Sequence, residues 1–168
     1  MKASELKELR YKVSDNFYLH EFYVSETYPD LAANMEVEIE DVVAISILVH
    51  QIVQPVRDFL GYELIIGSGK RDDALNDAVE GSEESQHLLA EAADLEIAGN
   101  IAWKVYHWLI EEFSNVIGQC IIYLNQNGIP RFIHVSTKTY RGSRKPCGEF
   151  LVKYGGSFYR FAGSRWDS

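Results

Sequence analysis

The sequence has little positive charge and few cysteines. Its 16 lysines and arginines stand against 25 aspartates and glutamates, which gives a formal net charge of -9 at pH 7. A surface of that charge is poorly suited to neutralising phosphates, so we expect no nucleic acid partner. The two cysteines, Cys120 and Cys147, have no spacing typical of a metal site. We expect free thiols rather than a disulfide.

Long apolar runs are also missing. No apolar stretch approaches the roughly 20 residues of a membrane-spanning helix. The first segment, "MKASELKELRYK", lacks the apolar core of a signal peptide. We therefore expect no stable membrane insertion, and synthesis in the cytoplasm without a signal peptide. Hydrophobic residues nevertheless make up 46% of the 168 residues, enough for a buried core, and the absence of repeats and linkers predicts one domain over 1–168.

Helical spacing of apolar residues is clearest in the first half of the chain. Residues 1–12 are typical of a short polar helix, and a long helix is predicted over about 38–60, with Gly61 as its stop. Pro55 lies inside this helix and predicts a kink or a break there. A second helix is predicted over about 99–115. Between these two helices, short apolar segments flank a long loop from about Ser68 to Ser85.

The second half of the chain has the pattern of antiparallel strands. "GQCIIYL" and "PRFIHVST" are joined by "NQNG", whose Asn-Gly pair favours a tight hairpin turn. "EFLVKY" and "SFYRFA" flank Gly155 and Gly156, which suits a second hairpin over about 148–162. Helices, a strand, a loop, a strand, a helix and then hairpins predict an α+β fold with helices packed on an antiparallel sheet.

Three residues stand out as possible metal ligands. His87 lies in a polar loop, Asp94 begins an apolar run, and His134 lies in the middle of a predicted strand, where its ring shares a face with Phe132 and Ser136. His20, His50 and His107 have no comparable context. Two imidazoles and one carboxylate form a common catalytic zinc set that leaves a position for water. The alternative is a hydrogen-bonded surface histidine and an aspartate at a strand edge.

The pattern around these residues resembles the zinc D-Ala-D-Ala carboxypeptidases and their L-Ala-D-Glu endopeptidase relatives, in the form often found in bacteriophages. Family members carry SGxR, an Asn, then SxHxxGxAxD, and later a strand with a second His. The matching positions here are Ser68, Gly69, Arg71, Asn76, Ser85, His87, Ala92, Asp94 and His134. The resemblance covers about residues 16–137 and implies the hedgehog-like fold of these peptidases.

The resemblance implies a Zn²⁺ site formed by His87, Asp94 and His134. It also implies that Arg71 lies near the metal, where a guanidinium stabilises a developing oxyanion or binds a peptide carboxylate. Ser85 would contact the substrate or shape the turn before His87. Asn76 would organise the long loop through backbone hydrogen bonds.

Two positions depart from the family pattern. Ala90 replaces the usual Gly, which is tolerable if its φ is negative. Arg131 stands three residues before His134, where the family usually has an acidic general base, and a guanidinium does not accept a proton at neutral pH. Possible substitutes are Glu111, Glu112, Asp72, Asp73 and Glu91. We take Glu112 as the candidate catalytic acid, because its helix end precedes the strands that carry His134.

The resemblance thus implies a zinc peptidase that cleaves stem-peptide amide bonds of peptidoglycan, with a role in phage lysis or entry. Without an export signal, it would reach the cell wall through a partner protein, a phage particle or lysis of the cell. Two alternatives stay open: a module that binds metal or muropeptide without cleaving it, and a structural protein of a virion. The bond that is cut and the oligomeric state are left open.

Overall fold

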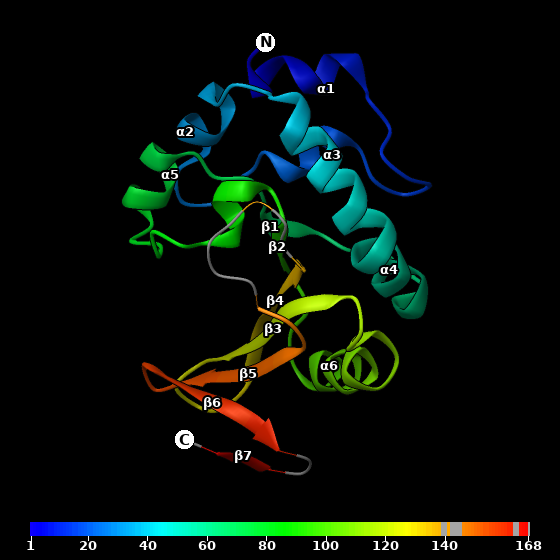
Figure 1. Cartoon of the computed structure of the whole chain (residues 1–168), viewed down its shortest axis with the longest axis vertical. Coiled ribbons are helices and arrows are strands. Elements are labelled where there is room, and N and C mark those ends of the chain that lie inside the picture. The colour runs from blue at the N-terminus through cyan, green and yellow to red at the C-terminus, as the bar shows by residue number, and fades with distance from the viewer. Residues whose placement is uncertain (139–140, 142–145, 163–164, 168) are drawn as a thin grey trace.

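The protein is built around one mixed sheet (Figure 1), described here from a computed structural model that covers residues 1–138, 141, 146–162 and 165–167. Within these residues the strand order is β1-β2-β4-β3-β5-β6-β7. Neighbouring strands are antiparallel except for β3 and β5, which are parallel. This arrangement confirms the predicted α+β class. The strands are β1 (Ile66–Ser68), β2 (Ala92–Leu95), β3 (Ile117–Leu124), β4 (Pro130–Thr137), β5 (Glu149–Tyr154), β6 (Ser157–Ala162) and β7 (Arg165–Asp167).

Most helices lie at the N-terminal end of the molecule, whereas α6 lies beside the central strands (Figure 1). The 3-10 helices are η1 (Ala3–Glu5), η2 (Leu19–Phe22) and η4 (Gln86–Leu89), and η3 (Val49–Val53) is a π-helix. The α-helices are α1 (Leu6–Leu9), α2 (Pro29–Asn34), α3 (Ile39–Leu48), α4 (Gln54–Leu60), α5 (Asp73–Ala78) and α6 (Asn100–Phe113).

The long helix predicted over 38–60 is interrupted where the sequence indicated. α3 passes into the π-helix η3, which ends just before Pro55 in the first turn of α4. Proline has no N–H for the regular hydrogen bond to the preceding turn, and the wider π turn accommodates that loss. Gly61 ends α4 at a φ of 74°, the left-handed conformation that a helix C-terminus favours.

The stretch Ile39–Leu60 is long and apolar enough to cross a membrane by length and composition, so the expectation that no such segment exists was wrong. Acidic and amide side chains break up its apolar run in the sequence. In the fold this stretch is a core helix, since Leu48, Ile52 and Val56 have no exposed surface. Buried core helices of folded domains often pass the same test.

The two faces of the sheet have different neighbours. Along β3 and β4, Ile122, Ile133 and Val135 point to one face and belong to the same core cluster as Val105 and Leu109 of α6. Because side chains alternate along a strand, His134 and its cross-strand partner Ile121 point to the opposite face. That second face carries the candidate site.

Both predicted hairpins are present. The turn between β3 and β4 has Gly128 at a φ of 74°, and Asn125 Oδ1 accepts hydrogen bonds from the backbone of Asn127 and Ile129. Gly155 and Gly156, with φ of 57° and 84°, connect β5 to β6. The long loop predicted from Ser68 to Ser85 was only partly right, because α5 lies inside it with Asp72 as its N-cap. Helices this short carry little periodicity.

Candidate metal centre

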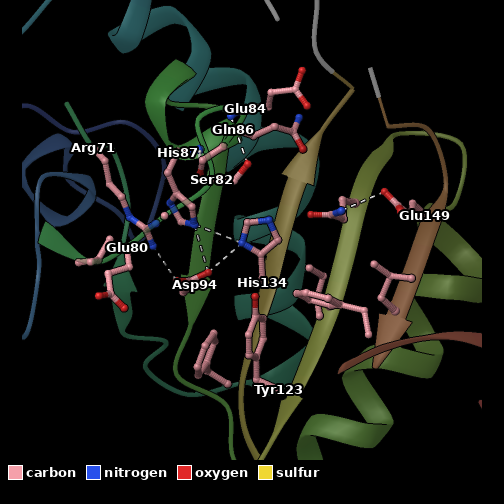
Figure 2. Close-up of a pocket in the computed structure, with 18 of the residues that line it drawn as sticks. Arg71, Glu80, Ser82, Glu84, Gln86, His87, Asp94, Tyr123, His134 and Glu149 are labelled. Atoms are coloured by element: carbon pink, nitrogen blue, oxygen red, sulfur yellow. Dashed lines mark hydrogen bonds and ion pairs between the residues drawn. The ribbon is translucent and has the colours of Figure 1, made fainter. Parts of the chain in front are cut away.

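Strand pairing brings Asp94 and His134 together. β2 and β4 are antiparallel, and Asp94 lies directly opposite His134 in their register. His87 reaches the same point from η4, which immediately precedes β2. His134 Nδ1 lies 2.9 Å from Asp94 Oδ1 and 3.2 Å from His87 Nε2, and His87 Nε2 lies 3.3 Å from Asp94 Oδ1. Three potential ligand atoms therefore meet at one point (Figure 2).

The local sequence holds the His87 ring in one orientation. Ser85 is the N-cap of η4 and its Oγ accepts a hydrogen bond from the His87 backbone N–H. The ring Nδ1 lies 2.6 Å from the carbonyl oxygen of Gly69. Because a carbonyl can only accept, Nδ1 carries the hydrogen and Nε2 keeps its lone pair. The backbone of the SGKR segment thus selects the tautomer that a metal requires.

The electrostatics of the cluster favour a neutral His87 and an ionised Asp94. Burial lowers the pKa of the His87 imidazole, and this effect outweighs the attraction of Asp94 for its charged form. Burial alone would raise the pKa of the Asp94 carboxyl. The positive charge that the His87 and His134 rings carry when protonated, together with their hydrogen bonds to the carboxylate, outweighs that effect and holds the pKa of Asp94 well below its usual range. Neutral imidazole and carboxylate are the forms that bind zinc.

The donor set fits a zinc ion. Tetrahedral zinc with bonds of about 2.0–2.1 Å to nitrogen and oxygen requires ligand atoms about 3.3 Å apart, close to the three separations observed. The side chains are not sealed from solvent: 3% of His87, 10% of His134 and 16% of Asp94 is exposed. All three residues line the adjoining cavity, so a zinc ion held by them would be open to water or substrate from the cavity, as catalytic zinc sites require.

Arg71 lies against the carboxylate of Asp94. Its Nη2 is 3.5 Å from Asp94 Oδ2, the oxygen that does not face the histidines. Nε and Nη2 also donate to Ser68 Oγ, and the Arg71 backbone N–H donates to the carbonyl of His87. Burial lowers the pKa of Arg71, and Asp94 opposes that shift. The structure thus brings together the predicted positions Ser68, Arg71, Ser85, His87, Asp94 and His134.

Two glycines make room for this arrangement. A Cβ on Gly69 would lie 2.2 Å from the backbone oxygen of Phe22, so the loop can pass this close to η2 only with glycine. A Cβ on Gly81 would lie 2.2 Å from Asn76 Oδ1 and 3.2 Å from Arg71 Nη1. Asn76 is buried and its Nδ2 donates to the carbonyl of Ser82. Asn76 therefore organises the loop, as predicted, and it does so beside Arg71.

A buried ion pair supports the loops from behind. Lys70 Nζ lies 3.0 Å from Asp41 Oδ2, and their side chains are 12% and 2% exposed. The same ammonium donates to the carbonyl of Leu88, the residue after His87. Asp41, in the first turn of α3, also pairs with Arg141. One charge cluster thus ties α3 to the segments that carry Arg71 and His87.

A cavity of about 870 Å³ adjoins the three ligands. The Tyr123 ring stacks on Phe132 with centroids 4.3 Å apart, and Figure 2 shows its hydroxyl directed toward His134. Burial and the charge of Asp94 raise the pKa of Tyr123 to about 12, so it remains a hydrogen-bond donor at neutral pH. The sequence analysis did not identify several cavity residues, namely Glu80, Glu84, Gln119, Tyr123, Glu149, Leu151, Phe158 and Arg160. Alternation along the strands could have indicated Tyr123, which shares a face with Ile121.

The structure does not bring Glu112 to this site. Glu112 is exposed near the end of α6, which packs on the other face of the sheet, and it is not among the cavity residues. The prediction used the order of the elements, and that order does not decide which face a helix covers. Glu111 is likewise exposed on α6. Glu91, the residue that directly precedes β2 in the sequence, is buried. Asp72 caps α5 through Leu75 N–H.

The structure also places three further positions near the site. Ala90 has a φ of 57°, so the negative dihedral that would make it an easy replacement for glycine is not found. Gln86 is buried, and its Nε2 donates to the carbonyl of Thr137. Arg131 is exposed and lines a neighbouring cavity with Glu26 and Glu96.

A comparison with known protein families shows which family the chain belongs to. The sequence profile described as Peptidase M15 matches residues 23–136, which is more than half of the chain and includes every ligand of the cluster. The chain belongs to the Peptidase M15 family. The match confirms the resemblance to zinc D-Ala-D-Ala carboxypeptidases. A comparison with curated protein sequences found no match.

Peptidase M15 proteins are in general zinc-dependent and act on peptidoglycan. The His87–Asp94–His134 group is the part of this chain that could hold that metal. The M15 match ends at residue 136, one residue before the end of β4. The β5–β6 hairpin, which contributes to the cavity, lies outside it.

Proposed function

We propose that this chain is a zinc peptidase that hydrolyses amide bonds in the stem peptides of peptidoglycan, of the D-Ala-D-Ala carboxypeptidase or the L-Ala-D-Glu endopeptidase type. The observation that carries the proposal is the meeting of His87 Nε2, Asp94 Oδ1 and His134 Nδ1 within 4.8 Å of one another at the wall of a cavity. Membership of the Peptidase M15 family supports the same chemistry.

Each polar group at the site has a distinct task in this proposal. His87, Asp94 and His134 would hold a zinc ion, which when bound would supply a Lewis acid to polarise the scissile carbonyl and lower the pKa of water. Arg71 presents a fixed guanidinium, suited to the oxyanion that develops during attack or to a substrate carboxylate. Tyr123 supplies a neutral phenol that donates a hydrogen bond to substrate.

The general base has to come from a position unlike that in other family members. Arg131 cannot accept a proton, and Glu112 lies on the other face of the sheet. Besides Asp94, the described residues that line the cavity include three carboxylates: Glu80, Glu84 and Glu149. We place the base among these three.

Amide variants test the base. One of Glu80→Gln, Glu84→Gln and Glu149→Gln should lower kcat by about 10²–10⁴-fold, the usual contribution of a general base, with zinc content unchanged. Glu112→Gln is the matched control and should keep wild-type turnover. If all three variants keep full turnover, the base lies elsewhere.

A digest tests the activity itself. Purified protein with zinc should release D-Ala from synthetic stem peptides, or cut the L-Ala-D-Glu bond in muropeptides, as read by mass spectrometry. His87→Ala should do neither. The proposal is contradicted if wild-type protein cleaves neither small stem peptides nor intact sacculi.

A binding module is the second candidate function, and Arg131 is the observation that favours it. In that case zinc and muropeptide bind, but nothing is cut. Arg131→Glu restores an acid three residues before His134 and distinguishes the two candidates. If wild-type protein is inactive and Arg131→Glu is active, the chain is an enzyme that has lost its general base. Turnover by wild-type protein rejects the binding module.

Access to the substrate is a separate part of the proposal. We propose that the protein is made in the cytoplasm and reaches the wall through a pore-forming partner, a phage particle or cell lysis. Expression in bacteria tests this: cells should remain intact with the protein alone and lyse when a pore-forming protein is added. Lysis by the protein alone would contradict a need for delivery.

A further inference from the structure

The candidate site continues along the sheet beyond the metal ligands. His134 lies opposite Ile121 of β3, Ile121 opposite Leu151 of β5, and Leu151 opposite Arg160 of β6. Residues directly opposite one another on neighbouring strands point to the same face. Arg160 therefore projects on the same face as the ligands. β4 and β6 are three strand spacings apart, about 14 Å at about 4.8 Å each.

One cavity connects these positions. Arg71 lines it beside the ligands and Arg160 lines it on β6. Between the ligands and Arg160, the cavity surface is formed by the buried side chains of Ile121 and Leu151, and Phe158 lies exposed near Arg160. The cavity therefore has apolar side chains between two guanidinium groups, with the polar side chains of Gln119 and Glu149 beside them. The two guanidinium groups suit a peptide that carries carboxylates.

The part of the wall that carries Arg160 is firmly attached. β5 pairs in parallel with β3, and Tyr106 of α6 donates its hydroxyl hydrogen to the carbonyl of Leu151. Gln119 Nε2 donates to Glu149 Oε2 at 2.9 Å, which connects β3 to β5 on the cavity side. A rigid platform positions a charged side chain better than a loop does.

Arg160 forms no ion pair with any residue whose side chain the structure describes. The carboxylate of Glu149, which also lines the cavity, accepts a hydrogen bond from Gln119. In a chain of net charge -9, an arginine in a cavity wall favours a ligand that carries a carboxylate. Arginine binds a carboxylate through two parallel hydrogen bonds.

We propose that Arg160 forms a distal subsite for a carboxylate of the stem peptide, with Leu151 and Phe158 as its apolar floor and rim. This inference rests on the proposed function and narrows its substrate class. An extended peptide advances about 3.4 Å per residue, so about four residues span the distance between His134 and Arg160. The substrate is therefore an extended stem peptide rather than an isolated D-Ala-D-Ala dipeptide.

Paired peptides and variants test the subsite. Calorimetry on the full-length protein, freed of metal to prevent turnover, compares a synthetic stem pentapeptide with versions in which one carboxylate at a time is a carboxamide. One of these amidations should weaken binding about tenfold, and Arg160→Gln should weaken binding of the unmodified peptide equally. Arg160→Gln should bind the amidated peptide with the same affinity as the unmodified peptide. Arg160→Lys, which keeps the charge but loses the paired hydrogen bonds, should fall between wild type and Arg160→Gln.

Arg10→Gln is the matched control, because it removes the same charge at an exposed position near α1, at the other end of the molecule (Figure 1). It should bind like wild type. If Arg160→Gln also binds like wild type, the subsite is overturned while the proposed function stands. The same holds if the loss of affinity from amidating the peptide and the loss from Arg160→Gln multiply when both changes are combined. If wild-type protein binds none of the peptides, the subsite is overturned, and the digest with zinc described above decides the proposed function.

Discussion

Asp94 and His134 lie 40 residues apart in the chain and directly opposite each other in the sheet, with Oδ1 and Nδ1 separated by 2.9 Å. The pairing of β2 with β4 holds both backbones. Each ligand therefore has a fixed position before any metal arrives, and only the η4 turn with His87 must be placed separately. The second oxygen of Asp94 faces Arg71, so one carboxylate connects the metal ligands to the group proposed to bind substrate.

Gly81→Ala should impair the site without removing a functional group. The new methyl group would lie 2.2 Å from Asn76 Oδ1 and 3.2 Å from Arg71 Nη1, so the Asn76 side chain must move and the adjacent Arg71 side chain must adjust. We expect kcat/KM on stem peptides to fall at least tenfold, because misplacement by about 1 Å is costly in catalysis. Zinc content should stay unchanged. Gly128→Ala lies in a turn far from the metal ligands, with open space around the glycine but a φ of 74°, and controls for a loss of stability that does not involve the site. Equal activity of both variants would contradict the role given to Gly81.

Ala90→Gly should stabilise the protein, although alanine to glycine exchanges usually destabilise. Ala90 has a φ of 57°, which costs an L-residue about 1–2 kcal/mol, whereas the buried methyl group contributes about 0.8 kcal/mol. We expect the free energy of unfolding to rise by about 0.5 kcal/mol in chemical denaturation. A decrease would show that the methyl packing outweighs the backbone strain.

Lys70→Met should destabilise the protein and weaken metal binding together. It leaves the buried carboxylate of Asp41 with Arg141 but without Lys70, and it removes the hydrogen bond to the carbonyl of Leu88. Breaking a buried pair in this way costs about 3 kcal/mol. The double variant Asp41→Asn with Lys70→Met should recover part of that loss, because the buried carboxylate that lost Lys70 is no longer charged, while Arg141 is partly exposed to solvent. If Lys70→Met melts like wild type and binds zinc equally well, the ion pair does not support the site.

The metal-free protein should lose stability in acid in two windows. Folding lowers the pKa of His87, so the unfolded chain binds more protons below about pH 6.5, and stability falls as the pH drops from there. Folding also lowers the pKa of Asp94, whose contribution is complete above its unfolded pKa of about 3.9 and is lost below it. Urea unfolding at a series of pH values, with chelator present, measures both. His87→Asn should make the free energy of unfolding depend less on pH just below about 6.5. An unchanged dependence in this range would contradict the assignment to His87.

The sequence was informative where the signal is local. Residue types indicated His87 and Asp94 as possible ligands, the resemblance to the zinc peptidases added Arg71, and Asn-Gly and Gly-Gly pairs predicted both hairpins. Pro55 indicated the break between α3 and α4. In each case the feature depends on a few neighbouring side chains or on backbone dihedrals that only certain residues adopt readily.

What the sequence could not show depends on contacts between distant segments. Glu112 was placed near the metal because nothing in the order of elements reveals that α6 packs on the other face of the sheet. Arg160 was overlooked because its place beside the cavity follows from the parallel pairing of β3 with β5. The φ of Ala90 depends on the turn between η4 and β2, and alanine itself gives no sign of a positive value.

Zinc content tests the central claim most directly. After dialysis against zinc and removal of loosely bound metal, elemental analysis should find one zinc per chain in wild-type protein. His87→Ala, Asp94→Ala and His134→Ala should each weaken zinc affinity by about 100-fold or more, since even residues behind a ligand cost 10–100-fold. His107→Ala, on the exposed side of α6, should bind like wild type. Wild-type protein without zinc, or ligand variants that keep wild-type affinity, would contradict the account.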